Sequence, residues 1–184
     1  MRYTGGINIE RQHGESQTAF AGRVLKVRVD PVWAKSGPTT REVVERPAAA
    51  AIIAETPDKR LVVVRQYRWA VADWLFELPA GLVEAGEEPL AAAKRELAEE
   101  TGWRAKHWQA VYRFFPSPGY STEEIHLFFA SGLVPGDPHG DPDEELEVSL
   151  WTAARADEAR LRGEITNGIM LIGVGWWLIH QARV

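Results

Sequence analysis

The chain has 184 residues, and its formal net charge is −5. A hydrophobic fraction of 45% and a charged fraction of 26% are typical of a globular protein, and this length fits one domain with a sizeable core. Because the chain has no cysteine, a disulfide framework, a thiol nucleophile and a zinc-thiolate site are all excluded. A duplex nucleic-acid binder normally has a basic face. No cluster of Lys and Arg supplies one here, so we expect no nucleic-acid partner.

The N-terminal part of the chain predicts a β hairpin. Apolar and charged residues interleave over residues 23–30, which indicates a half-buried strand. A turn pattern follows at residues 35–38, and residues 41–46 form the returning strand. A proline then separates this part from the rest. We therefore expect an N-terminal antiparallel β extension at residues 1–46 and a larger domain at residues 47–184.

Further strands are predicted on both sides of a central helix. Residues 48–55 and 60–68 are apolar runs around a Thr-Pro-Asp-Lys turn. The other strand-like runs are at residues 74–78, 109–115, 125–130 and 146–151. The Pro- and Gly-rich segment 135–142 is a loop of the kind that carries function.

The central helix carries closely spaced acids. Pro89 suits its first turn, because the missing N–H would be unpaired there, and Gly102 is a natural C-terminal stop. Glu96 and Glu100 lie one turn apart on one face, with Glu99 beside them. Three carboxylates this close repel one another unless a cation lies between them. Oxygen ligands select magnesium or manganese rather than zinc.

Two helices are predicted at the C-terminal end, at residues 156–162 and 168–179. The second is apolar but too short to cross a bilayer, and Thr166 or Asn167 can cap it. The first residues of the chain are polar and have no apolar h-region, so we expect no signal peptide, no membrane partner and a cytoplasmic location. Strands around a central helix, with more helix at the end, indicate an α+β fold, a mixed α/β/α sandwich.

Residues 81–103 resemble the Nudix box, whose pattern is G-x5-E-x7-R-E-U-x-E-E-x-G-U with U apolar. Every specified position is filled, by Gly81, Glu87, Arg95, Glu96, Leu97, Glu99, Glu100, Gly102 and Trp103. The resemblance extends from about residue 47 to the C-terminus. It implies a mixed sheet between helices, and hydrolysis of a nucleoside diphosphate linked to another group.

The resemblance also implies metal ligands. Glu96 and Glu100 are expected to bind Mg²⁺ directly, with Mn²⁺ as a substitute. Glu99 is expected to be a ligand or a catalytic group that shares the ion, and Ala80 a ligand through its carbonyl oxygen. Divalent cations neutralise a diphosphate and lower the pKa of a bound water. Glu87 is expected to orient these groups rather than bind the ion.

A general base is expected on a loop well after the box, as in the Nudix subfamily that this chain resembles most. The candidates are Glu144, which we favour, and Glu145. A solvated acidic loop without a catalytic role is the open alternative for both. Glu147 falls on a predicted strand, where it is expected to face solvent.

A second match narrows the class of expected substrates. Ser117, Pro118 and Gly119 follow the box, with Pro118 fifteen residues past Trp103. This spacing, and the segments 64–68 and 115–123, look like the ADP-ribose pyrophosphatase subfamily. The resemblance implies hydrolysis of ADP-ribose to AMP and ribose 5-phosphate, with the Ser-Pro-Gly segment at the substrate.

The same resemblance suggests substrate contacts. A diphosphate suits an arginine fork, and a base suits an aromatic face. Arg68 and Arg41 match subfamily arginines of the substrate site, and Glu123 matches an acid near the terminal ribose or the attacking water. Trp33 and Tyr120 are candidates for stacking on the adenine. Packing within the core is the open alternative for either ring.

Members of this subfamily commonly pair through exchanged N-terminal strands. We therefore expect a homodimer in which residues 1–46 are the exchanged arm and Arg41 or Trp33 acts in trans. Another nucleoside diphosphate sugar, such as GDP-mannose or ADP-glucose, is the first alternative substrate. A Nudix-like domain that only senses its ligand is a remote alternative, because such domains usually lose box acids.

Overall fold

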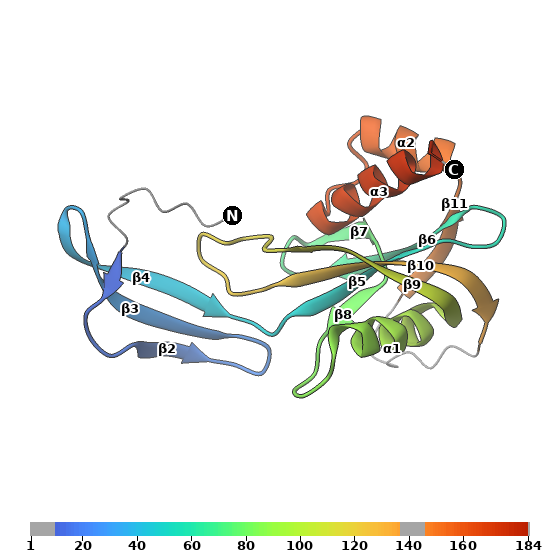
Figure 1. Cartoon of the computed structure of the whole chain (residues 1–184). Helices are drawn as coiled ribbons and strands as arrows, with labels where there is room; N and C mark the ends of the chain where they lie inside the picture. The colour runs from blue at the N-terminus through green and yellow to red at the C-terminus, as the bar shows by residue number, and fades with distance from the viewer. Residues whose placement is uncertain (1–9, 137–145, 184) are drawn as a thin grey trace. The chain divides into compact units, whose positions relative to one another are not determined.

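The computed structural model describes residues 10–136 and 146–183 (Figure 1). The chain divides into two compact units. One holds Met1–Pro47 and Ser117–Glu123, and the other holds Ala48–Pro116 and Glu124–Val184. Each unit has its own β structure.

The first unit is an antiparallel sheet around β3 (Lys26–Ala34). β4 (Gly37–Glu45) pairs along one edge of β3, so the predicted hairpin is present. β1 (Arg11–Gln12) and β2 (Gln17–Ala21) pair with successive parts of the other edge. The sequence did not predict these two strands, because every residue in them is exposed and no alternation of buried and polar positions marks them.

The segment Ser117–Glu123 joins this sheet at Val44, near the C-terminal end of β4. The Val44 N–H donates to the carbonyl of Tyr120 (2.7 Å), and the Thr122 N–H donates to the carbonyl of Val44 (3.0 Å). The Arg46 N–H donates to the Thr122 hydroxyl (3.0 Å). These hydrogen bonds attach the second half of the segment to the end of β4, mainly through backbone groups.

The second unit contains two sheets. In the first, the strand order is β8-β5-β10-β9, with bounds Ala80–Leu82, Ala49–Ala54, Ile125–Pro135 and Trp103–Phe114. β5 and β10 run parallel, and the other pairs are antiparallel. In the second sheet, β6 (Leu61–Arg68) lies between β11 (Leu146–Trp151) and β7 (Asp73–Glu77). β5 is apolar throughout because both of its faces are buried.

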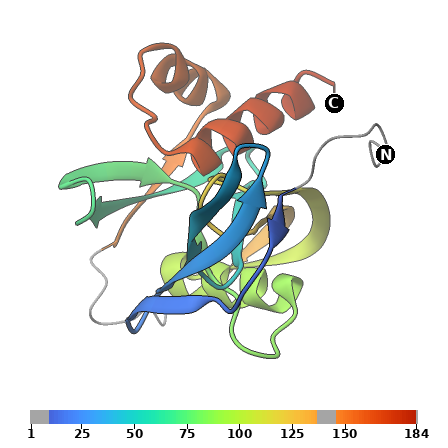
Figure 2. The ribbon, with the colours of Figure 1, turned by 90° about the vertical axis from the view of Figure 1, so that its left-hand side faces the viewer.

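Helices cover both faces of the mixed sheet. Side chains of β5 alternate between two cores: Ile53 packs in a cluster with Trp177, and Ile52 in a cluster with Leu97. The first core belongs to α3 (Gly168–Gln181), which lies side by side with α2 (Ala153–Leu161) in both views (Figure 1, Figure 2). The second belongs to α1 (Pro89–Thr101). The predicted α/β/α sandwich is confirmed.

The helix ends follow the local sequence. Pro89 is the first residue of α1, and Gly102 ends it with a φ of 71°, a left-handed conformation that favours glycine. Asn167, one of the two predicted caps, accepts a hydrogen bond from the Met170 N–H (3.0 Å) and begins α3. In the part of the chain that the structure describes, no helix is long and apolar enough to cross a membrane.

Candidate active site

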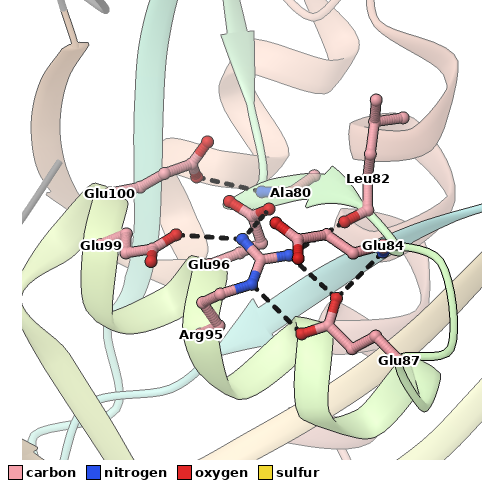
Figure 3. A network of polar contacts seen from close by, with 8 residues as sticks. All are labelled: Ala80, Leu82, Glu84, Glu87, Arg95, Glu96, Glu99 and Glu100. Carbon is pink, nitrogen blue, oxygen red and sulfur yellow. Dashed lines mark hydrogen bonds and ion pairs between the residues drawn. The ribbon is translucent and has the colours of Figure 1, made fainter. Parts of the chain in front are cut away.

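The acidic face of α1 lies against β8 (Figure 3). A carboxylate oxygen of Glu100 accepts a hydrogen bond from the Ala80 N–H (3.0 Å). The Glu96 carboxylate lies directly over Gly81: a Cβ at position 81 would be 2.0 Å from its carboxylate carbon. Real Cβ atoms do not come so close to another atom. Glycine therefore leaves the space that the Glu96 carboxylate occupies beside the β8 backbone.

Arg95 connects most of the remaining acids (Figure 3). Its Nη1 donates to Glu96 (2.6 Å) and Glu99 (3.0 Å). Its Nε and Nη2 each donate to Glu87 (3.1 Å), and Nη2 also donates to the carbonyl of Leu82 (3.0 Å). These bonds use the five N–H groups of the guanidinium. Arg95 and Glu99 are one helical turn apart, a spacing that favours their pairing, but this pair is one part of a larger network.

Within this network, the hydrogen bonds to Glu87 favour the ionised form of its carboxyl group. The hydrogen bond from Arg95, and then that from the Glu84 N–H (3.0 Å), hold the pKa of the Glu87 carboxyl below its ordinary value. The same hydrogen bond raises the pKa of Arg95 above the ordinary arginine value. Glu87 is therefore ionised near neutral pH and fixes the loop before α1 to the helix.

The donor set is suited to a hard divalent cation. Glu96, Glu99 and Glu100 supply carboxylate oxygens from one stretch of α1, and the space over Gly81 admits one of these carboxylates beside β8. As the side chains stand, no group of three or more His, Cys, Asp or Glu residues within 10–136 and 146–183 is arranged to hold an ion. Arg95 engages two of the three carboxylates, and the third is directed to the Ala80 N–H.

Arg68 lies at the end of β6 in the same unit. Its Nε and Nη2 donate to the two carboxylate oxygens of Glu77 (2.9 and 2.5 Å). Glu77 is only 5% exposed, and a buried carboxylate of this kind requires a charged partner. Arg65 projects from the other face of β6, over the rings of Trp74 and Phe76 (5.1 and 5.8 Å to the centroids).

The other predicted substrate residues belong to the first unit. Arg41 forms an ion pair with Glu10, and Glu123 forms one with Arg46 (3.3 Å). The ring of Trp33 lies 5.1 Å from that of His13.

Neither candidate stacking ring packs in the core. Trp33 is 52% exposed and Tyr120 is 59% exposed. Both therefore offer surface to a ligand or to a second chain.

Ser117, Pro118 and Gly119 form a turn. The Ser117 carbonyl accepts hydrogen bonds from the N–H groups of Tyr120 (3.2 Å) and Ser121 (2.9 Å). The turn presents Pro118, Gly119 and Tyr120 at the surface.

The predicted general bases, Glu144 and Glu145, lie outside the described residues. Glu147, the residue expected to face solvent, is exposed on β11 and lies 3.2 Å from Arg65 across the strand pair. Arg65 and Glu147 therefore form an ion pair at the surface.

Sequence reasoning missed several partners. The box pattern marks Gly81 but does not say that a carboxylate fills the space beside it. Glu77 and Arg68 are nine residues apart, and only the pairing of β6 with β7 brings them together. Nothing in the sequence singles out Arg46 as the partner of Glu123.

Comparison with known proteins identifies the family. Residues 45–168 match the NUDIX domain. The chain therefore belongs to the NUDIX domain family and is a Nudix hydrolase.

Relatives match most of the chain. It is 40% identical over 146 residues to a methanol dehydrogenase activator of Bacillus methanolicus, covering 79% of each chain. It is 39% identical over 163 residues to an ADP-ribose pyrophosphatase of Mycobacterium tuberculosis, covering 86% of this chain and 79% of that one. A crystal structure of an ADP compounds hydrolase superposes with a TM-score of 0.79 at 25% identity, covering 92% of this chain and 95% of the other.

Proposed function

We propose that this Nudix hydrolase cleaves the diphosphate linkage of ADP-ribose, giving AMP and ribose 5-phosphate, with Mg²⁺ as cofactor and Mn²⁺ as a substitute. The observation that carries the proposal is the row of box carboxylates on α1 beside the backbone of Ala80 and Gly81. Two similar proteins, an ADP-ribose pyrophosphatase and an ADP compounds hydrolase, support the choice of substrate.

We propose roles for four box residues and for Ala80. Glu96, Glu100 and the carbonyl of Ala80 would hold the cation. When bound, a divalent cation neutralises diphosphate charge and lowers the pKa of a water. Glu99 is proposed as a further ligand or as a catalytic group that shares the ion, and Arg95 as the residue that positions the carboxylates. Glu144 or Glu145, outside the described residues, stays the predicted general base.

The proposed phosphate contact is Arg68. Its bidentate bond to Glu77 holds the guanidinium plane in one orientation, so little side-chain entropy is lost when a phosphate binds. Arg41 is the second proposed phosphate contact.

The remaining substrate contacts are proposed in the first unit. We assign Glu123 to the terminal ribose or to the attacking water, as a catalytic group. We assign the base to Trp33 or Tyr120, and a positioning role to the turn formed by Ser117, Pro118 and Gly119. The exposure of both rings supports their assignment.

We further propose a homodimer in which residues 1–46 form an exchanged arm and residues 47–184 the catalytic domain. All of β2 is exposed, so the arm buries little of its own surface. In the catalytic domain, α3 exposes Leu171, Ile172 and Ile179 along a groove of about 620 Å³. Apolar surface of this kind is suited to cover by a second copy.

One experiment tests the reaction directly. The protein is incubated with ADP-ribose and Mg²⁺ in ¹⁸O-labelled water, and the products are analysed by mass. We expect AMP and ribose 5-phosphate, with the label in one of them, which identifies the phosphorus attacked.

A substrate panel separates the alternatives. The ratio kcat/KM is measured for ADP-ribose, GDP-mannose, ADP-glucose and NADH. A higher value for GDP-mannose or ADP-glucose than for ADP-ribose would replace the proposed substrate. Failure to hydrolyse any of them, with the metal present, would favour a ligand-sensing domain.

A further inference from the structure

A hollow lies between α1 and β9, next to the face of α1 that carries Glu96 and Glu100. It has a volume of about 380 Å³ and is lined by Lys94, Arg95, Ala98, Arg104, Ala105 and Trp108. Small-molecule sites generally have volumes of about 300–1,000 Å³. Lys94 and Ala98 are one turn apart on α1, on a face that holds neither Glu96 nor Glu100. The hollow therefore lies beside the face that carries the proposed metal ligands, and Arg95, which pairs with Glu96 and Glu99, lies between the two.

The charge of this hollow is positive. Three of its six lining residues are cations, and none is an acid. Arg95 is engaged by the box acids, but Lys94 and Arg104 make no ion pair or side-chain hydrogen bond with any residue that the structure describes. In a chain with a net charge of −5, two cations that line one hollow and have no acidic partner among residues 10–136 and 146–183 favour an anionic ligand.

Trp108 forms a fixed wall of the hollow. Its indole N–H donates to the Ala105 carbonyl (3.2 Å), and its ring lies edge-on to Phe128, with centroids 6.5 Å apart. These contacts hold the ring from within the protein. A ligand that packs against it therefore loses little additional side-chain entropy.

We propose that this hollow binds a small phosphate monoester. The phosphate dianion is bound by Lys94 and Arg104, and the organic part packs against Trp108 and the methyl groups of Ala98 and Ala105. Arginine and lysine are the side chains that bind phosphate most strongly. The site does not depend on which substrate is hydrolysed at the acids.

Binding is measured on the full chain in EDTA, so that no divalent cation brings the ligand to the acids of α1. The probes are AMP, ribose 5-phosphate, inorganic phosphate and uncharged ribose. Calorimetry gives the affinities, and the ¹⁵N-labelled indole of Trp108 reports the site by NMR. We expect both monoesters to bind more tightly than inorganic phosphate, to shift the Trp108 signal and to weaken as salt increases.

The Lys94→Ala/Arg104→Ala double variant should bind the monoesters at least about tenfold more weakly, because each lost charge-assisted hydrogen bond alone is worth about that factor. Lys106→Ala is the matched control, since it removes one exposed cation from the same strand outside the hollow. All three mutated side chains are exposed, so the fold should survive, and circular dichroism checks this.

Three results would overturn the proposal. The first is unchanged affinity in the double variant. The second is an equal loss in Lys106→Ala, which would indicate attraction by net charge alone. The third is equal affinity for inorganic phosphate and the monoesters, which would leave the organic part without a site.

Discussion

Gly81 sets how closely the Glu96 carboxylate approaches β8. In Gly81→Ala the new Cβ would lie 2.0 Å from the carboxylate carbon, so the carboxylate must move. The displaced group is the end of a flexible side chain, and the fold should therefore persist. A proposed metal ligand displaced by about 1 Å or more should lower kcat about 100-fold. We expect this loss at saturating Mg²⁺, with little change in the unfolding midpoint.

The control for Gly81→Ala is Gly168→Ala. A Cβ at Gly168, the first residue of α3, would meet no atom within 4 Å, and alanine favours a helix relative to glycine. This variant should keep full activity and be slightly more stable. Full activity in Gly81→Ala would show that the position of Glu96 does not matter for turnover.

Glu100→Gln tests the proposed ligand role directly. The substitution keeps the size of the side chain but removes its charge, so the hydrogen bond with the Ala80 N–H can persist while cation binding is weakened. We expect kcat to fall by at least about 100-fold.

Glu88→Gln is the matched control, because Glu88 precedes α1, is exposed and makes no capping hydrogen bond with its side chain. Activity of Glu100→Gln within about tenfold of the wild type, about 1.4 kcal/mol of barrier, would remove Glu100 from the mechanism.

At the scale of elements, Arg95 and Glu87 attach the loop between β8 and α1 to the helix. The folded-state pKa of Glu87 lies below its ordinary value of 4.5. Its ionised form therefore stabilises the folded chain above about pH 4.5, and this stabilisation is lost as pH falls through the lower, folded-state pKa. We expect Glu87→Gln to be less stable than wild type at pH 7 and the difference to close in acid. Urea unfolding in EDTA across this range measures it; a difference that widens on acidification would contradict the assignment.

The anchor of α3 is a buried carboxylate at the end of the central sheet. Glu55 is 3% exposed and accepts hydrogen bonds from the indole N–H of Trp177 (2.9 Å), from Gln181 and from Lys59 (2.7 Å). Trp177→Phe removes one donor from a buried charge, and we expect a loss of about 1–3 kcal/mol in the free energy of unfolding. Trp69→Phe, at an 87% exposed position, should change it by less than about 0.5 kcal/mol. Equal effects would mean that the buried bond contributes nothing.

The sequence predicted those elements whose pattern is local. α1 begins at Pro89 and is ended by Gly102, the two residues that the sequence marks as its end signals. β8 was missed because three residues are too few for a pattern. β9 begins at Trp103, six residues before the predicted strand, because its first half pairs with the end of β10 and pairing across a sheet is not visible in a local window.

At the scale of the whole molecule, the sequence identified the carboxylates but not their partners. The box fixes the spacing of Glu96, Glu99 and Glu100 along one helix, so their common face follows from helix geometry. Which basic side chain pairs with each acid depends on contacts between helices and strands that lie apart in the sequence. For example, Arg68 meets Glu77 only through strand pairing. The roles of residues in the first unit stay predictions for the same reason.

Strand exchange predicts that a defect in the arm and a defect at the acids complement each other. Arg41→Ala and Glu100→Gln each should be inactive alone. In a mixed dimer, the Arg41→Ala subunit keeps its acids and receives an intact arm from its partner. Random pairing should make half the dimers mixed, each with one restored site of two, so about a quarter of wild-type activity should return on co-expression. Sedimentation of the wild type should show a dimer at the same concentration. A stable, active monomer, or no recovery in co-expressed mixtures that sediment as dimers, would rule out action in trans.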